Sequence, residues 1–179
     1  TNVAMGPVYI QAYTRVDEVL KSGNEKSGTT AISAIIRQTP DGKKRFLYTA
    51  NVGDARIVLN RDNLPIRLTK GTLPAPPLKR TTNNEQTTDH RPGDEEEQAR
   101  IKAAGGIFIQ GKVGGTLAVT RAFGDSDLQE WVKAEPYLRE IELLPNDKHL
   151  ILACDGVRAT TLSFPFPFLP FLRFFCSVD

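Results

Sequence analysis

The first clear hydrophobic pattern in the chain is helical. In the stretch PVYIQAYTRVDEVLKSG apolar residues recur at spacings of three and four, which is typical of one face of an amphipathic helix. Gly23 follows this stretch and suits the position just beyond a helix end. The spacing therefore predicts a helix that ends near Gly23, and its buried face is expected to consist of Val8, Ala12, Val16, Val19 and Leu20.

Between residues 27 and 69 the pattern changes to short runs of β-branched and aromatic residues. Turn sequences separate the runs, namely Pro40-Asp41-Gly42, Gly53-Asp54 and Asp62-Asn63. This arrangement predicts three or four antiparallel strands joined as a meander.

The second half of the chain contains a short helix signal followed by more strand signals. Asp94 is a candidate N-cap, acidic residues follow it, and Lys102 precedes Gly105, so both charge placements favour a helix dipole. The stretch GGIFIQGKVGG predicts a hairpin, a strand is expected after Pro136, and residues 149–154 form an apolar strand that we expect to be buried. Strands predominate without a βαβ rhythm, so the predicted fold class is α+β with antiparallel sheets.

Two segments break these patterns. Residues 71–87 and 158–179 each hold three of the twelve prolines, and neither follows a helical or strand period. Apart from Arg173, the residue types of SFPFPFLPFLRFFCS have pyrimidine-rich codons, as in the tract before an intron acceptor site, and the Val157 codon begins with the donor dinucleotide GU. We interpret residues 158–179, which we expect to form neither strand nor helix, as translated intron. The insert at 71–87 either shares this origin or is a genuine loop.

Composition narrows the class of protein. The 179 residues suffice for one domain with a substantial core, and a net charge of +2 argues against nucleic acid or an anionic membrane as a partner. The N-terminus lacks a secretory signal pattern, and the apolar stretch 162–175 is shorter than the ~20 residues of a membrane-spanning helix. Two cysteines provide no disulfide framework, so we expect a reducing compartment, the cytoplasm or nucleus.

Several polar residues are candidates for chemistry. Asp155 follows the apolar strand at 149–154 and is either an oxygen ligand for Mg²⁺ or Mn²⁺ or a structural turn residue. Asp54 is expected to form a turn or to pair with Arg56, and Asp125 to organise a loop. His90 is expected to be a surface residue. The residue patterns alone therefore predict only that the chain is an α+β domain, and they assign no function.

The order of seven motifs adds a resemblance. SGTTA, ANVGDARIVL, DHRP, EEQARIKAAGG, GTLAVTRAFGD, WVKAEPYL and LILACDG follow one another as they do in type 2C protein phosphatases, the metal-dependent PPM family of protein serine/threonine phosphatases. The chain resembles this family from the first predicted helix to Val157, apart from 71–87. This implies a partial phosphatase domain over residues 1–157, with two antiparallel sheets packed as a sandwich and helices outside.

The resemblance also implies a reaction and site residues. Members of the family hydrolyse phosphoserine and phosphothreonine in phosphoprotein substrates with a water activated by two Mg²⁺ or Mn²⁺ ions. By motif position, Asp155 corresponds to a direct metal ligand and Asp89 to a ligand of a weaker third metal. Asp54, Arg121 and Asp125 correspond to positions with structural roles.

Other family motifs are absent from the printed sequence. It contains neither the D-G-H-G nor the late D-N motif, which supply metal ligands, and Ala159 stands where a further aspartate is expected. The general acid and the phosphate-binding arginine of the family have no counterpart, so no catalytic residue is assigned. We therefore expect this chain to be inactive by itself. The alternative is a non-catalytic, phosphatase-like binding module, and the oligomeric state is not predicted.

Overall fold

The structure, a computed structural model, describes residues 4–23, 26–69, 89–155 and 175–177. The predicted insert at 71–87 and most of the tail lie outside these ranges. The helices are α1 (Met5–Ser22), α2 (Glu95–Ala103) and the short 3-10 helix η1 (Ser126–Leu128). The strands are β1 (Gly28–Thr29), β2 (Ala31–Gln38), β3 (Arg45–Val52), β4 (Arg56–Arg61), β5 (Leu64–Arg67), β6 (Phe108–Ile109), β7 (Lys112–Val113), β8 (Phe123–Gly124), β9 (Tyr137–Leu143), β10 (Asp147–Ala153) and β11 (Phe175–Ser177).

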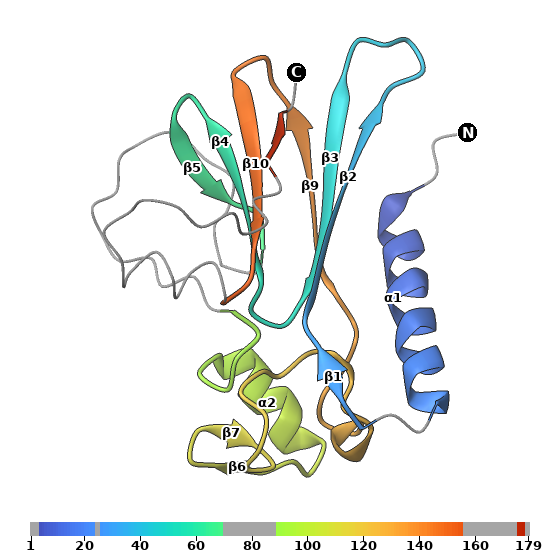
Figure 1. Cartoon of the computed structure of the whole chain (residues 1–179), viewed down its shortest axis with the longest axis vertical. Coiled ribbons are helices and arrows are strands. Elements are labelled where there is room, and N and C mark those ends of the chain that lie inside the picture. The colour runs from blue at the N-terminus through green and yellow to red at the C-terminus, as the bar shows by residue number, and fades with distance from the viewer. Residues whose placement is uncertain (1–3, 24–25, 70–88, 156–174, 178–179) are drawn as a thin grey trace, which may run out of the picture.

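Two antiparallel sheets form the upper part of the molecule (Figure 1). One has the strand order β2-β3-β9 and the other β11-β10-β4-β5. β2 and β3 form a hairpin in which Ala31 is paired with Val52 and Gln38 with Arg45. The expectation of antiparallel strands is confirmed, but a single meander is wrong, because β3 and β4 follow each other in sequence and belong to different sheets.

The chain crosses between the sheets at Gly53 and Asp54. Gly53 has a φ of 87°, in the left-handed region that glycine adopts without strain. A Cβ at Gly53 would lie 2.3 Å from Cγ2 of Thr30. This tight corner sends the chain from β3 into the facing sheet, so β4 pairs with β10 and β5 instead of β3.

The main hydrophobic core lies between the two sheets. Both sheets contribute its buried residues, which are Leu47, Ile57, Leu59, Leu68, Leu143 and Leu150. The expected burial of the strand at 149–154 holds only in part, since Ile151 is 39% exposed while its neighbour Leu150 is buried. Successive residues of a strand face opposite sides of a sheet, so the core takes only every second side chain of β10.

The tail contributes one strand. β11 is antiparallel to β10, with backbone pairs His149–Ser177, Leu150–Cys176 and Ile151–Phe175. The expectation that residues 158–179 contain no strand is therefore wrong for this segment. Backbone N–H and C=O groups at a sheet edge accept any chain in extended conformation as a partner, whatever its wider composition.

Helix α1 covers the outer face of the β2-β3-β9 sheet, and its buried side differs from the predicted one (Figure 1). Its buried residues are Tyr9, Tyr13 and Asp17. The hydroxyls of Tyr9 and Tyr13 donate to the backbone carbonyls of Tyr48 and Ala50 at 3.1 Å each. Tyrosine buries its ring and keeps a polar contact, so this stripe docks on β3 in preference to the valines.

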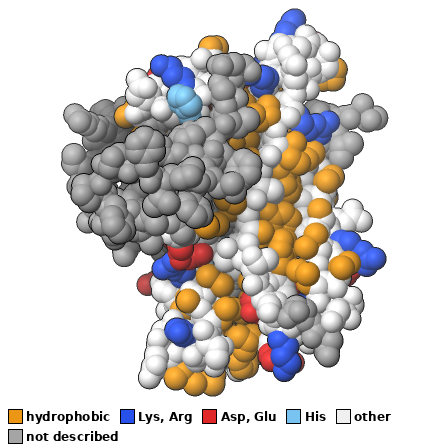
Figure 2. All heavy atoms as spheres, viewed as in Figure 1, with side chains coloured by type: hydrophobic (Ala, Val, Ile, Leu, Met, Phe, Trp, Pro, Cys, Tyr) orange, Lys and Arg blue, Asp and Glu red, His pale blue; other side chains and the backbone are white. Residues whose placement is uncertain are grey.

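The predicted valine face of α1 is largely exposed to solvent. Val8, Val16 and Val19 are all exposed, whereas Leu20 packs partly against the core. Figure 2 shows hydrophobic side chains along the length of the molecule, over β2 and β3 and toward α1. Ile35 and Ile36 of β2 are also exposed, and as successive strand residues they lie on opposite faces of the sheet.

Replacing Tyr13 by phenylalanine tests the docking of α1. Tyr13 Oη lies 3.1 Å from the Ala50 carbonyl and 2.8 Å from Ser33 Oγ, so the variant leaves a buried acceptor without its donor. We expect Tyr13→Phe to lower the free energy of unfolding by about 1 kcal/mol in urea titrations. The control Val16→Ala, at a side chain that is 46% exposed, is expected to change it by less than about 0.5 kcal/mol. A larger loss of unfolding free energy for Val16→Ala than for Tyr13→Phe would instead support burial of the predicted valine face.

Helix α2 lies at the lower end of the molecule with the hairpin of β6 and β7 (Figure 1). As predicted, Asp94 caps the helix, and its side chain accepts hydrogen bonds from the backbone N–H groups of Glu96 and Glu97. Ile101 of α2 and Val113 of β7 belong to a second core beneath the sandwich. No helix in the described part of the chain is long and apolar enough to cross a membrane.

Candidate functional site

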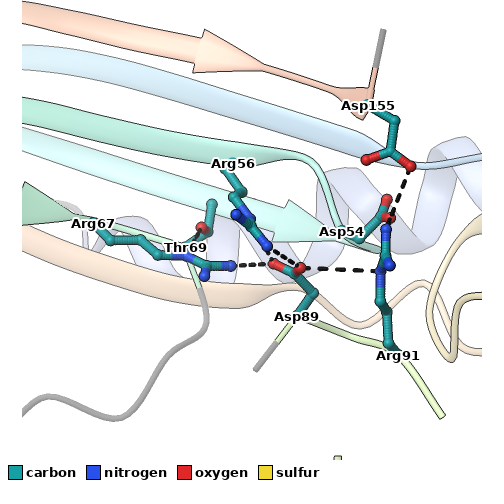
Figure 3. Close-up of polar contacts among 7 residues, drawn as sticks. All are labelled: Asp54, Arg56, Arg67, Thr69, Asp89, Arg91 and Asp155. Atoms are coloured by element: carbon teal, nitrogen blue, oxygen red, sulfur yellow. Dashed lines mark hydrogen bonds and ion pairs between the residues drawn. The ribbon is translucent and has the colours of Figure 1, made fainter. Parts of the chain in front are cut away.

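The candidate site lies where three parts of the chain meet at one end of the β11-β10-β4-β5 sheet (Figure 3). Asp155 is the second residue after the end of β10, and Asp54 is the second residue before the start of β4. These strands are neighbours, with Ala153 opposite Arg56, so the register brings the two aspartates to the same end of the sheet. The third part is the segment of Asp89 and Arg91, which leads into α2.

Backbone hydrogen bonds hold the segment before α2 against the crossing between the sheets. The N–H of His90 donates to the carbonyl of Gly53 at 3.2 Å, and the His90 carbonyl accepts from Thr120 N–H at 2.9 Å. The N–H of Asp94 donates to the Arg91 carbonyl at 3.0 Å. The positions of Asp89 and Arg91 are therefore fixed on either side of a buried residue.

Asp89 is buried and paired with two arginines. Its Oδ1 accepts from Nε of Arg56 at 3.1 Å and its Oδ2 from Nη2 of the same residue at 2.7 Å, a two-point pairing. Arg67 of β5 also donates to Oδ1, while its Nε donates to Thr69 Oγ1 at 3.1 Å. Both carboxylate oxygens of Asp89 are thus engaged by guanidinium groups.

Burial by itself would raise the pKa of Asp89. Hydrogen bonds and positive charge from Arg56 and Arg67 outweigh this effect and hold the pKa below its ordinary value. Asp89 is therefore ionised in neutral solution, and its charge is compensated within the protein.

Arg91 lies among three carboxylates (Figure 3). Its Nε donates to Asp54 Oδ2 at 3.0 Å, and its Nη2 contacts the same oxygen. The same Nη2 is 3.3 Å from Oδ2 of Asp155, and Nε is 4.0 Å from Oδ2 of Asp89. Arg91 thereby connects the two predicted metal ligands, which come from segments separated by more than sixty residues.

The structure changes the interpretation of several predicted residues. Asp54 does not pair with Arg56, as one alternative had it, because Arg56 contacts Asp89 and Asp54 contacts Arg91. His90 is fully buried, so its expected surface position is wrong. The cause is that this segment docks on the crossing between the two sheets through the hydrogen bond from His90 N–H to the Gly53 carbonyl. This docking removes the imidazole of His90 from solvent.

Two further candidate residues, Asp125 and Arg121, lie away from this site, and their contacts stabilise the fold. Asp125 adopts a left-handed conformation with a φ of 48° and precedes the helix η1. Arg121 donates to the buried carboxylate of Glu97 at 2.7 Å and to the Glu135 carbonyl at 2.8 Å. Both arrangements agree with the structural roles expected for these positions.

Sequence reasoning missed Arg67 and Arg91, and it named Arg56 only as a possible partner of Asp54, whereas Arg56 pairs with Asp89. Arg56 and Arg91 stand inside the motifs ANVGDARIVL and DHRP, but nothing in the local pattern links either residue to the carboxylate that it contacts in the structure. Arg67 ends an ordinary strand, and its role depends on the pairing of β5 with β4. The one available signal was the charge content of the two motifs.

The residues present do not fit a divalent metal ion in the arrangement observed. Mg²⁺ requires about six oxygen ligands in near-octahedral geometry at roughly 2.0–2.1 Å. The Asp89 oxygens face Arg56 and Arg67, and Arg91 lies between Asp54 and Asp155. Within the described ranges no group of three or more His, Cys, Asp or Glu side chains could hold a metal ion. The ligand roles of Asp89 and Asp155 therefore stay predictions.

Comparisons with known proteins agree with the sandwich and the ordered motifs. The family model described as "Protein phosphatase 2C" matches residues 8–158. Protein phosphatase 2C homolog 1 of Schizosaccharomyces pombe is 39% identical over 135 residues, which cover 75% of this chain and 34% of the relative. The Saccharomyces cerevisiae protein of the same name is 36% identical over 160 residues, covering 82% and 50%. The chain thus spans between a third and a half of these relatives.

Solved structures share the fold. The serine-threonine phosphatase 2C of Toxoplasma gondii superposes with a TM-score of 0.61 at 20% identity, over 84% of this chain and 49% of that one. A sex determining protein of C. elegans gives a TM-score of 0.62 at 25% identity, over 84% and 33%. Because the family match extends over residues 8–158, well over half of its length, the chain belongs to the metal-dependent protein phosphatase 2C family.

Proposed function

We propose that this chain is the central part of a protein serine/threonine phosphatase that hydrolyses phosphoserine and phosphothreonine in phosphoprotein substrates. The observation that carries the proposal is the family match over residues 8–158. The meeting of Asp89 and Asp155, two motif aspartates, around Arg91 at one end of the sandwich supports it. We propose Mg²⁺ or Mn²⁺ as the ion of the complete protein, since carboxylate oxygens suit both.

We further propose that the 179-residue chain has no phosphatase activity by itself. Its described carboxylates at the site are paired with arginines, and the D-G-H-G and D-N motifs are absent from the printed sequence. A divalent ion held by a single exposed aspartate keeps most of its water ligands and binds weakly. Asp155 is such a residue, with a side chain that is 62% exposed.

A pair of assays tests both parts of the proposal. The purified chain, incubated with a phosphothreonine peptide and Mn²⁺, is expected to release no phosphate above the blank. A chimera of the Saccharomyces cerevisiae relative, carrying residues 8–155 in place of its matching segment, is expected to hydrolyse the peptide in a Mn²⁺-dependent manner. The unmodified yeast relative is the positive control. Turnover by the chain alone would contradict its inactivity, and a folded but inert chimera would contradict the phosphatase assignment.

The alternative function, a non-catalytic binding module, has one observation in its favour. The charges of the site are compensated by arginines, so the described side chains form a stable surface without a metal ion. Fluorescence polarisation with phosphorylated and unphosphorylated forms of one peptide separates the two functions. Retention of the phosphorylated peptide, together with an inert chimera, would favour the binding module.

A further inference from the structure

We infer that Thr39 is a phosphorylation site for a proline-directed protein kinase, with ATP as the phosphoryl donor. In this transfer a bond forms between Oγ1 of Thr39 and the γ-phosphorus of ATP, the bond from that phosphorus to the β,γ-bridging oxygen breaks, and ADP leaves. The hydroxyl proton of Thr39 passes to the catalytic aspartate of the kinase. The inference goes beyond the proposed function and does not depend on it.

The first support is the dipeptide Thr39-Pro40. In the 179-residue sequence it is the only place where proline follows serine or threonine. Proline has no backbone N–H, so a kinase site that lacks an acceptor for this group takes a Thr-Pro pair in preference to others. Proline also favours an extended backbone at the residue before it, and Thr39 directly follows the last residue of β2. An extended segment therefore leads into Thr39, which is the conformation in which kinases bind substrate peptides.

The second support is the place of Thr39 in the fold. Thr39 begins the turn between β2 and β3, which lies at the upper end of the molecule (Figure 1). β3 leads from this turn to the crossing at Gly53 and Asp54, so the candidate site lies at the other end of the strand. Residues 40–44 are exposed, and Thr39 is partly exposed. A kinase therefore reaches this turn without contacting the core or the candidate site.

Few contacts hold the turn closed. The N–H of Gly42 donates to the Thr39 carbonyl at 2.8 Å, and the N–H of Thr39 donates to the Lys44 carbonyl at 2.9 Å. None of the three hydrophobic core clusters in the described part of the chain includes a residue of this turn. The free end of a hairpin opens at a much lower cost than the whole domain, so a kinase binds the turn without unfolding the sandwich.

The third support is that the Thr39 hydroxyl shapes the turn, so its modification has a structural effect. Its Oγ1 donates to Oδ1 of Asp41 at 2.5 Å and accepts from the N–H of Lys44 at 3.0 Å. Hydrogen bonds from Thr39 and from the N–H of Lys43 hold the pKa of Asp41 below its ordinary value, so this carboxylate is ionised in neutral solution. A phosphate on Oγ1 removes the donor and adds about −1.5 to −2 charges beside Asp41.

Two lysines supply counter-charge for the phosphate. Lys43 and Lys44 directly follow Gly42, and both are exposed. Nζ of Lys44 pairs with Oε2 of Glu142 at 3.0 Å, in an ion pair whose side chains are 55% and 38% exposed. An exposed pair of this kind contributes little to stability and gives way to a stronger anion. We expect Lys43 and Lys44 to turn toward the phosphate and to offset part of its repulsion from Asp41.

Incubation of the full 179-residue chain with a purified cyclin-dependent kinase and ATP tests this inference. Mass spectrometry is expected to find about one phosphate per chain, carried by Thr39. Pro40→Ala is expected to lower the rate of incorporation about tenfold or more, because its backbone N–H has no acceptor in the kinase. The matched control Pro145→Ala, at an exposed proline that follows Leu144, is expected to react at the native rate.

Two further comparisons make the test specific. Thr39→Ser keeps the hydroxyl and is expected to accept phosphate, whereas Thr39→Val is not. A synthetic peptide of residues 34–45 measures the rate without the fold. Incorporation at another residue or an equal rate for Pro40→Ala and the native protein would overturn the inference. So would a native rate below about a hundredth of the peptide rate, because only unfolded molecules would then react. If Pro40→Ala fails to fold by circular dichroism, Thr39→Ser decides: absence of incorporation overturns it.

Thermal unfolding tests the effect on the turn. Phosphorylation is expected to lower the melting temperature, and the loss should be about 1–2 °C larger in Lys43→Gln, which removes a counter-ion. The control Lys148→Gln, at an exposed lysine of β10, is expected to show the native loss. Equal losses in Lys43→Gln and the native protein would contradict this role of Lys43.

Discussion

Replacing Glu97 by glutamine is expected to lower the free energy of unfolding by about 3 kcal/mol, the cost of breaking a buried ion pair. The Glu97 side chain is 1% exposed. Its carboxylate accepts hydrogen bonds from Nη2 of Arg121 at 2.7 Å and from Nη2 of Arg100 at 2.9 Å. Glutamine cannot neutralise two guanidinium groups, so both would remain partly buried beside an uncharged side chain.

The Glu97 pairing matters because it anchors the helix that follows the candidate site. Arg100 also donates to the carbonyls of Trp131 and Thr120, at 2.8 and 2.9 Å, which ties α2 to the segment after β7. Urea titration at neutral pH measures the loss, which corresponds to roughly 2–4 °C in melting temperature per kcal/mol. The matched control is Glu95→Gln, at an exposed position in the first turn of the same helix.

The same residue predicts a pH dependence. Burial alone would raise the pKa of Glu97, but hydrogen bonds and charges of Arg121 and Arg100 hold the pKa far below the ordinary 4.5. A lowered pKa in the folded state means that the contribution to stability is complete above pH 4.5 and declines as the pH falls further. Native protein should therefore lose stability below pH 4.5 more steeply than Glu97→Gln. Equal acid profiles, or equal stability of Glu97→Gln and Glu95→Gln, would contradict this role.

Replacing Asp89 by asparagine is expected to lower the free energy of unfolding by about 2 kcal/mol in the presence of a metal chelator. The expected loss is smaller than for Glu97 because Arg56, one of the two partners, is about one third exposed. Arg67, the other partner, is mostly buried and would lose its carboxylate. The loss of stability is expected even when a chelator has removed all metal ions, because it results from the ion pairs of Asp89 with Arg56 and Arg67.

Asp155→Asn is the matched control for this prediction. Asp155 is the other predicted metal ligand, but its side chain is 62% exposed and its contact to Arg91 is long, at 3.3 Å. Its replacement should change stability by less than about 0.5 kcal/mol, as is typical of exposed ion pairs. Thermal unfolding of both variants with chelator and with Mn²⁺ completes the comparison. An Asp89→Asn protein as stable as the native one in chelator would reject Asp89 as a structural counter-ion.

Much of the local structure could be predicted from short stretches of sequence. The Asp94 cap, the end of α1 at Gly23 and the hairpin of β6 and β7 depend on hydrogen bonds and backbone preferences within a few residues. The wrong predictions concern the contacts that each helix or strand makes with the rest of the fold. The buried face of α1 was placed on the valines because apolar spacing does not register the hydroxyl contacts of Tyr9 and Tyr13 with β3.

For the candidate site, too, local features could be predicted from the sequence, whereas contacts between distant residues could not. The sequence by itself determined the α+β class, the ordered family motifs and the two aspartates, Asp89 and Asp155, because these depend on residue identity and local spacing. Only the tertiary structure decided which arginine neutralises which carboxylate. The crossing at Gly53 separates β3 from β4, and the pairing of β4 with β10 then brings Asp54 and Asp155 to the same arginine. Ion pairing depends on distances of a few ångströms between residues far apart in the chain, and only folding sets those distances.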